Sequence, residues 1–223
     1  MVTRAVVGSK GGVVLLHGHG RTGRSMASIA ATLKRDGYST LAPSYNSPWR
    51  SLAHIVDHLK PRIDHYAREI DGPLHFVSHS LGGLVVRALI ASHRPEKLGR
   101  VVMLAPPNRG SELADLLFRL RLDHLVLGPV GPQLRTGRAR IDQDMLGRVD
   151  YELGIIAGDR PLDPIFPRFL LPRPNDGKVS VTSTRLRNMR DHIVLPVSHT
   201  LMVYDRRVIT QVLAFLETGS FNR

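Results

Sequence analysis

Short apolar runs alternate with longer amphipathic segments along this chain, and that alternation limits the folds open to it. The apolar runs are rich in valine, leucine and isoleucine, which is typical of buried strands. The predicted strands cover residues 13–16, 40–42, 74–77, 101–104, 152–157 and 193–195. The predicted helices cover residues 25–36, 52–69, 81–92 and 206–216. This order predicts an α/β protein with a mainly parallel, doubly wound sheet, helices on both faces and ligands beyond the carboxyl ends of the strands.

The size of the chain fits a single domain. It has 223 residues, of which 42% are hydrophobic, enough for one sizeable core. We therefore expect one domain over residues 1–223, with an insertion at 107–150 that is long for a plain connection. The apolar side of this insertion is formed by Leu113, Leu116, Leu117, Leu120, Leu125, Val126 and Leu127. Two interpretations stay open: a small cap that binds an acyl chain, or a helix packed on the core.

The stretch SHSLGG at residues 78–83 joins a predicted strand to a predicted helix. A serine at such a bend exposes its hydroxyl above the sheet, and the small residues Ser78 and Gly82 on either side let neighbouring backbone pass close by. The amide of Leu81 begins the helix and can donate to a developing oxyanion. The pattern predicts a nucleophile at Ser80, while a plain glycine-rich turn also explains the motif taken alone.

A second loop, HGHG at residues 17–20, follows the first apolar run. Acyl transfer needs two preorganised donors for its oxyanion, one after the nucleophile and one from the loop after an earlier strand. We assign the second donor to the backbone amide of His19. The alternative is a simple glycine turn in which His17 is a hydrogen-bonded loop histidine.

The C-terminal part supplies an acid and a base, in the segments NDGKV at 175–179 and VSHT at 197–200. A serine hydroxyl is a weak nucleophile, so it needs an imidazole to take its proton and a carboxylate to orient that imidazole. Asp176 and His199 are the candidates. The order Ser80, Asp176, His199 differs from the orders of the chymotrypsin and subtilisin types.

Together these motifs resemble those of α/β-hydrolases of the small bacterial lipase and esterase kind. The resemblance covers most of the chain and rests on HGHG, HSLGG, APPNRGS, NDGKV and VSHT in that order. It implies the α/β-hydrolase fold, with Ser80 as nucleophile, Asp176 as triad acid and His199 as general base. It also implies an oxyanion hole made by the amides of His19 and Leu81. The departure is Ser78, where the family usually has glycine or alanine, because its hydroxyl must find a partner.

The resemblance further implies a serine hydrolase that cleaves carboxylic esters, of a small molecule or a lipid, through an acyl-enzyme on Ser80. No metal or organic cofactor is required. An amidase or a thioesterase would use the same residues. A noncatalytic binding protein of this fold is the alternative from another class, but such a protein has no need to retain Ser80, His199 and an acid in order.

The triad acid has two rivals, Asp159 and Asp163. Both follow the predicted strand at 152–157 more closely than Asp176 does, at the strand end where this fold usually carries its acid. We favour Asp176 because its NDGKV setting and its separation from His199 resemble the family pattern. As a base, His192 ranks below His199 because it precedes the last predicted strand instead of following it.

Charge and composition limit the kinds of partner that the chain is expected to bind. The formal net charge of +12 is unusual for an enzyme of neutral esters and favours weak attraction to anionic surfaces. The arginines are dispersed and only 5% of residues are aromatic, so we expect no specific nucleic-acid binding. The sequence leaves the oligomeric state open.

No stretch approaches a membrane span, and the first apolar run is short and lacks a small-residue cleavage site, so we expect a cytoplasmic protein. The absence of cysteine excludes disulfides, thiol catalysis and cysteine-ligated metals. His54 and His58 lie four apart on a predicted helix, but HIVDH lacks the glutamate of H-E-x-x-H. A polar helix face explains these histidines better than a metal site.

Overall fold

The computed structural model describes residues 10–162 and 171–223, and within these ranges six strands form a parallel sheet. The α/β fold and the mainly parallel, doubly wound sheet predicted from the sequence are confirmed. Across the sheet the order is β2 (Ser39–Leu41), β1 (Gly12–Leu16), β3 (Leu74–His79), β4 (Leu98–Leu104), β5 (Leu153–Gly158) and β6 (Asp191–Leu195).

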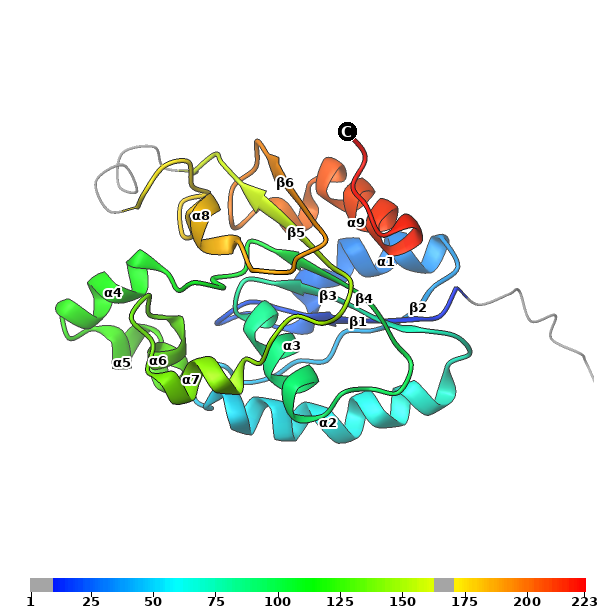
Figure 1. Ribbon diagram of the computed structural model, residues 1–223, viewed down its shortest axis with the longest axis horizontal. Helices are drawn as coiled ribbons and strands as arrows, with labels where there is room; N and C mark the ends of the chain where they lie inside the picture. The colour runs from blue at the N-terminus through cyan, green and yellow to red at the C-terminus, as the bar shows by residue number, and fades with distance from the viewer. Residues whose placement is uncertain (1–9, 163–170) are drawn as a thin grey trace, which may run out of the picture.

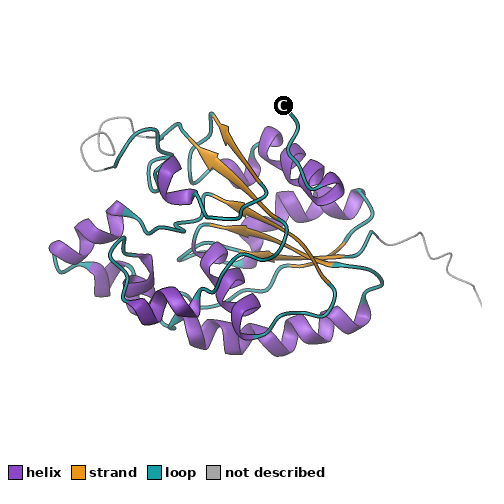
Figure 2. Ribbon diagram, in the orientation of Figure 1, coloured by secondary structure: helices purple, strands orange, loops and turns teal. Residues whose placement is uncertain are grey.

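Helices cover both faces of the sheet (Figures 1 and 2). Helices α2 (Leu52–Glu69) and α3 (Leu81–Ser92) pack on one face, and α1 (Ala27–Arg35) and α9 (Arg206–Thr218) pack on the other. Successive strand residues point to opposite faces, so Val14 joins the first core and Val13 the second. Burial on both faces explains why these strands read as continuous apolar runs.

Several element boundaries differ from the sequence prediction by one to three residues. Strand β4 begins at Leu98 instead of Val101, so it includes the polar Arg100. The residues before α1 form a 3-10 helix, η1 (Gly23–Met26), which shortens the predicted helix. His192 lies inside β6, so the placement of this histidine before the last strand is wrong.

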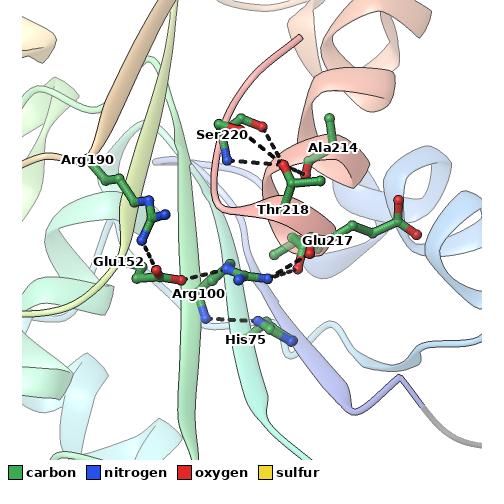
Figure 3. A network of polar contacts seen from close by, with 9 residues as sticks. His75, Arg100, Glu152, Arg190, Ala214, Glu217, Thr218 and Ser220 are labelled. Carbon is green, nitrogen blue, oxygen red and sulfur yellow. Dashed lines mark hydrogen bonds and ion pairs between the residues drawn. The ribbon is translucent and has the colours of Figure 1, made fainter.

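A network of charged groups ties the amino ends of three strands to the end of α9 (Figure 3). Arg100 lies 2.6 Å from Glu152, which also pairs with Arg190. The guanidinium of Arg100 donates to the carbonyls of Leu216 (2.8 Å) and Glu217 (3.0 Å). Cations are favoured at these last carbonyls of a helix, so Arg100 holds α9 against the sheet.

Residues 107–150 form short helices that gather at one end of the molecule (Figure 1). They are α4 (Glu112–Arg119), α5 (Asp123–Val126), the 3-10 helix η2 (Gly128–Val130), α6 (Gly131–Leu134) and α7 (Arg140–Met145). Arg138 lies late in this region and donates to the carbonyl of Asn108, near the start of the region, at 2.8 Å. This hydrogen bond links the two parts of the region.

Shorter elements complete the chain: α8 (Val181–Thr184) follows β5, and the 3-10 helix η4 (Met202–Tyr204) precedes α9. In the described ranges, none of the helices combines the length and apolar character needed to cross a bilayer.

Candidate active site

Ser80 lies at the sharp turn between β3 and α3. Its backbone has φ 54° and ψ −121°, a strained conformation for a residue other than glycine. Its amide donates to the carbonyl of Leu104 at 2.8 Å, which ties the turn to β4. A Cβ at Gly82 would lie 2.4 Å from the carbonyl oxygen of Leu16. Only glycine therefore lets α3 start this close to β1.

Asp176 and His199 form a buried pair beside this turn. His199 Nδ1 lies 2.8 Å from Asp176 Oδ2, and the backbone amide of His199 donates to the Asp176 carbonyl at 3.0 Å. The other carboxylate oxygen accepts from the amides of Lys178 (2.9 Å) and Val179 (2.8 Å). Since Nδ1 donates its proton to the carboxylate, Nε2 is left as the proton acceptor of the ring.

Ser80 and His199 both line one cavity of about 180 Å³. Among the described residues, no hydrogen bond joins the Ser80 hydroxyl to His199. Such contacts often tighten only when substrate binds. The geometry therefore brings the predicted nucleophile and base to the same space, with Asp176 behind the base.

The loop that carries Asp176 returns to the end of β5. A Cβ at Gly158 would lie 2.9 Å from Asp176 Cβ and 2.3 Å from the carbonyl of Val197. Asp159, the next residue, pairs with Arg160 at 3.7 Å, and among the described residues no hydrogen bond or ion pair joins it to His199. Asp163, the other rival for the acid, lies outside the described residues.

His79 supports the position of His199. It is buried, and its Nε2 donates to the backbone carbonyl of His199 at 2.9 Å. Burial first, and then the neighbouring His199, hold the pKa of His79 well below 6.5, so the ring is neutral. Sequence reasoning missed this contact, because only the fold brings residues 79 and 199 together.

The two predicted oxyanion donors, His19 and Leu81, also line the cavity. Leu81 is the first residue of α3, so its amide has no acceptor within the helix. The His19 amide has no acceptor among the described residues. The His19 side chain donates from Nε2 to the carbonyl of Val126 at 3.0 Å, and burial lowers its pKa. The loop with the predicted donor is thereby bonded to α5.

His17 supports the same loop through ring stacking and hydrogen bonds. Its buried ring stacks on Tyr45 with centroids 3.9 Å apart. Its Nδ1 donates to the Gly18 carbonyl at 2.8 Å, and its Nε2 accepts from the Tyr45 amide at 3.2 Å. His17 is therefore a hydrogen-bonded loop residue, and this holds whether or not the His19 amide is an oxyanion donor. Ser78, in contrast, is buried with its hydroxyl unpartnered among the described residues.

The insertion supplies much of the apolar wall of the cavity. The apolar residues that line it are Leu81, Pro107, Leu113, Ala114, Leu117, Val126, Leu127, Leu134 and Val179. Other residues of its apolar side face solvent, with Leu120 56% and Leu125 85% exposed. The insertion therefore contacts the space above Ser80, and its role as a cap stays a prediction.

Two cations that sequence reasoning did not single out, Arg21 and Lys178, also line the cavity. Arg21 directly follows the HGHG motif and Lys178 belongs to NDGKV, but the two are far apart in the chain and only the fold shows that they share a space. In the described part of the chain, no group of three or more histidine, aspartate or glutamate side chains is arranged to hold a metal ion.

Comparisons with known proteins agree with this architecture. The mature lipase BlEst2 of Bacillus licheniformis is similar over 95% of this chain and 93% of its own, with a TM-score of 0.75 at 18% identity. Phospholipase PlaB of Legionella pneumophila is similar over 93% of this chain and 59% of its own, with a TM-score of 0.68 at 17% identity. A carboxylesterase structure from Nitrososphaera gargenis gives 0.63 at 16% identity, over 93% and 90% of the two chains.

A search of curated protein sequences gave no significant match. The family model described as the alpha/beta hydrolase family matches residues 13–216. That range begins in the first strand and ends in the last helix, and so includes all six strands and the turn at Ser80. The chain therefore belongs to the alpha/beta hydrolase family.

Proposed function

We propose that the chain is a serine hydrolase that cleaves carboxylic esters, with Ser80 as nucleophile, His199 as general base and Asp176 as the acid that orients the base. The observation that carries this proposal is the buried Asp176–His199 pair, 2.8 Å apart, beside the same cavity as the strained Ser80. The lipase, phospholipase and carboxylesterase among the similar structures support ester chemistry at the level of the fold.

In the first step, His199 Nε2 takes the hydroxyl proton of Ser80 while the serine oxygen bonds to the acyl carbon. The carbonyl oxygen becomes an oxyanion and accepts from the amides of His19 and Leu81. When the tetrahedral intermediate collapses, the bond to the alcohol breaks. The alcohol leaves with the proton from His199, and the acyl group stays on Ser80.

In the second step, His199 takes a proton from water as the water oxygen attacks the acyl carbon. The second oxyanion accepts hydrogen bonds from the same two amides. Collapse then releases the carboxylic acid, and the proton returns from His199 to Ser80. Asp176 stays ionised throughout and stabilises the charged imidazole.

The size of the cavity favours short acyl groups. An apolar cavity of about 150 Å³ accepts one benzene molecule, so about 180 Å³ holds an acyl group of roughly six carbons. We therefore propose faster hydrolysis of butyrate than of palmitate esters. A cytoplasmic location and the lack of specific nucleic-acid binding stay predictions.

The test is hydrolysis of p-nitrophenyl acetate, butyrate and palmitate by the wild-type protein and by folded Ser80→Ala. Activity that disappears in the variant supports the proposal, and the trend with chain length separates esterase from lipase behaviour. Activity that survives the substitution contradicts the assignment of the nucleophile. A folded wild type that hydrolyses none of the esters, and that a fluorophosphonate probe does not label, favours a binding role.

A further inference from the structure

Arg21 and Lys178 reach the cavity from two different loops. Arg21 follows the HGHG loop after β1, and Lys178 belongs to the NDGKV segment after β5. Both line the same space as Ser80 and His199. Two positive charges are thus placed beside the proposed reacting groups by parts of the chain that meet only in the fold.

Neither cation is matched by a carboxylate in the described part of the chain. Within residues 10–162 and 171–223, no ion pair or side-chain hydrogen bond involves the guanidinium of Arg21 or the ammonium of Lys178. Asp176 is the carboxylate that acts on Lys178. Its oxygens already accept from His199 and from the amides of Lys178 and Val179. Its charge is therefore committed to the base.

The two cations also act on each other and on the histidines of the site. Displacement of water by surrounding atoms lowers the pKa of Lys178, and the charge of Arg21 lowers it further. Both cations contribute to the low pKa of His79, and Lys178 to that of His19. Like charges held near each other repel, and an anion between them relieves that repulsion.

Several other described arginines have partners. Arg100 and Arg190 share Glu152, and Arg223 pairs with Asp191 at 2.5 Å. Arg87 and Arg138 donate to backbone carbonyls. Arg21 and Lys178 have no such partner among the described residues, and both line the cavity beside Ser80. This placement indicates a group that arrives with the substrate.

We propose that Arg21 and Lys178 bind a negatively charged group of the substrate, a carboxylate, sulfonate or phosphate, beside the ester that Ser80 attacks. This inference rests on the proposed function, since it names the substrate class of the same site. The leucines of the insertion line the apolar part of the cavity and suit the acyl chain. The charged group therefore belongs to the alcohol part of the ester.

Three esters with nitrophenol leaving groups test the proposal. They are p-nitrophenyl butyrate, the butyrate of a hydroxynitrobenzoic acid, which has a carboxylate on the leaving group, and p-nitrophenyl hemiglutarate, which has one on the acyl chain. The wild type is compared with Arg21→Gln, Lys178→Gln and the double variant. Arg24→Gln combined with Lys34→Gln removes the same charge at residues outside the cavity and serves as the matched control.

The readout is kcat/KM for each charged ester divided by that for the neutral ester. For the ester with the charged leaving group, we expect this ratio to fall about tenfold or more in the double variant and less than about twofold in the control. An equal fall in the control would reveal a general effect of net charge and overturn the proposal. A selective fall for the hemiglutarate instead would overturn the placement of the anion on the alcohol side.

A binding measurement separates failure of this inference from failure of the proposed function. Calorimetric titration with butyl phosphate requires no turnover. Binding to the wild type that is lost in the double variant supports the anion site, even if no ester is hydrolysed. Absent binding, or binding that the double variant retains, overturns it, even if Ser80 proves to be the nucleophile.

Discussion

The two ends of the parallel sheet differ in whether their charged side chains are paired with one another. At the amino ends of the strands, Arg100, Glu152 and Arg190 satisfy one another (Figure 3). At the carboxyl ends, Arg21 and Lys178 face a cavity without a carboxylate partner among the described residues. The first arrangement is complete within the protein, whereas the second leaves two cations for the anionic group that we propose in the substrate.

The size of a hollow does not distinguish these two ends. The hollow at the amino ends, lined by His75, Arg100 and Glu152 among others, is about 800 Å³, larger than the cavity at Ser80. Its arginines, however, are already paired with carboxylates. Unmatched groups and strained backbone, both found at Ser80, mark a candidate active site better than volume does.

The largest expected effect is a loss of activity caused by a substitution at the carboxyl ends of the strands. Asp176→Asn should lower kcat about ten-thousandfold, because the amide no longer fixes the tautomer of His199. The melting temperature should change little, since asparagine keeps the shape of the residue. Steady-state kinetics and thermal unfolding check this, with Asp159→Asn as the matched control. If Asp159→Asn abolishes turnover and Asp176→Asn does not, the assignment of the acid is wrong.

A second substitution tests the crowding at the carboxyl ends. In Gly158→Ala, the new methyl would meet Asp176 and the Val197 carbonyl. We expect a loss of about 1 to 3 kcal/mol in unfolding free energy and about a hundredfold loss of kcat, because the acid is displaced. Gly137→Ala is the control, since nothing lies within 4 Å of its added Cβ. Equal kinetics in the two variants would contradict the reading that Gly158 makes room for Asp176.

At the amino ends the expected effect is on stability alone. Glu152→Gln removes the charge that Arg100 and Arg190 share, and these side chains are 27% and 51% exposed. Such partly screened pairs predict a loss of about 1 to 2 kcal/mol in urea unfolding, with kcat/KM unchanged. A large fall in kcat/KM would contradict the proposal that the charged groups at the amino ends of the strands contribute to stability and not to catalysis.

The smallest expected effect is on pH dependence. Burial, with the charge of Arg100 second, lowers the pKa of His75 from 6.5 to about 4. The unfolded chain therefore takes up a proton that the folded chain refuses, so stability is lost as pH falls from 6.5 toward 4. In His75→Asn, we expect about 1 kcal/mol less of this loss between about pH 7 and about pH 5. Urea titrations at the two pH values measure it, and identical losses in both proteins would contradict the role of His75.

The sequence was a good guide to the sheet because both faces of the sheet are buried. Apolar runs therefore predicted all six described strands to within a few residues. The largest error was at the start of β4, where Gly99 and Arg100 interrupt the apolar pattern. Arg100 can lie in the strand because its side chain reaches Glu152 and the end of α9. These contacts join residues far apart in the chain, so composition alone does not predict them.

Motif order likewise guided the search to Ser80, Asp176 and His199, and the structure brings the last two into contact. Motif order could not have revealed that His79 supports His199, or that Arg21 and Lys178 line the same cavity. These relations join residues more than a hundred positions apart, and each partner is an ordinary residue type for its loop. Their significance comes from burial and unmatched charge, which are properties of the folded chain.

The bond between His19 and Val126 has a mechanical consequence. Because the His19 ring donates to the Val126 carbonyl at 3.0 Å, we expect a displacement of α5 to move the loop that carries the predicted oxyanion donor. An acyl chain too long for the cavity would push α5 outward and draw the His19 amide away from the reacting carbonyl. For such a chain, we therefore expect excess length to lower the rate of the chemical step as well as the affinity.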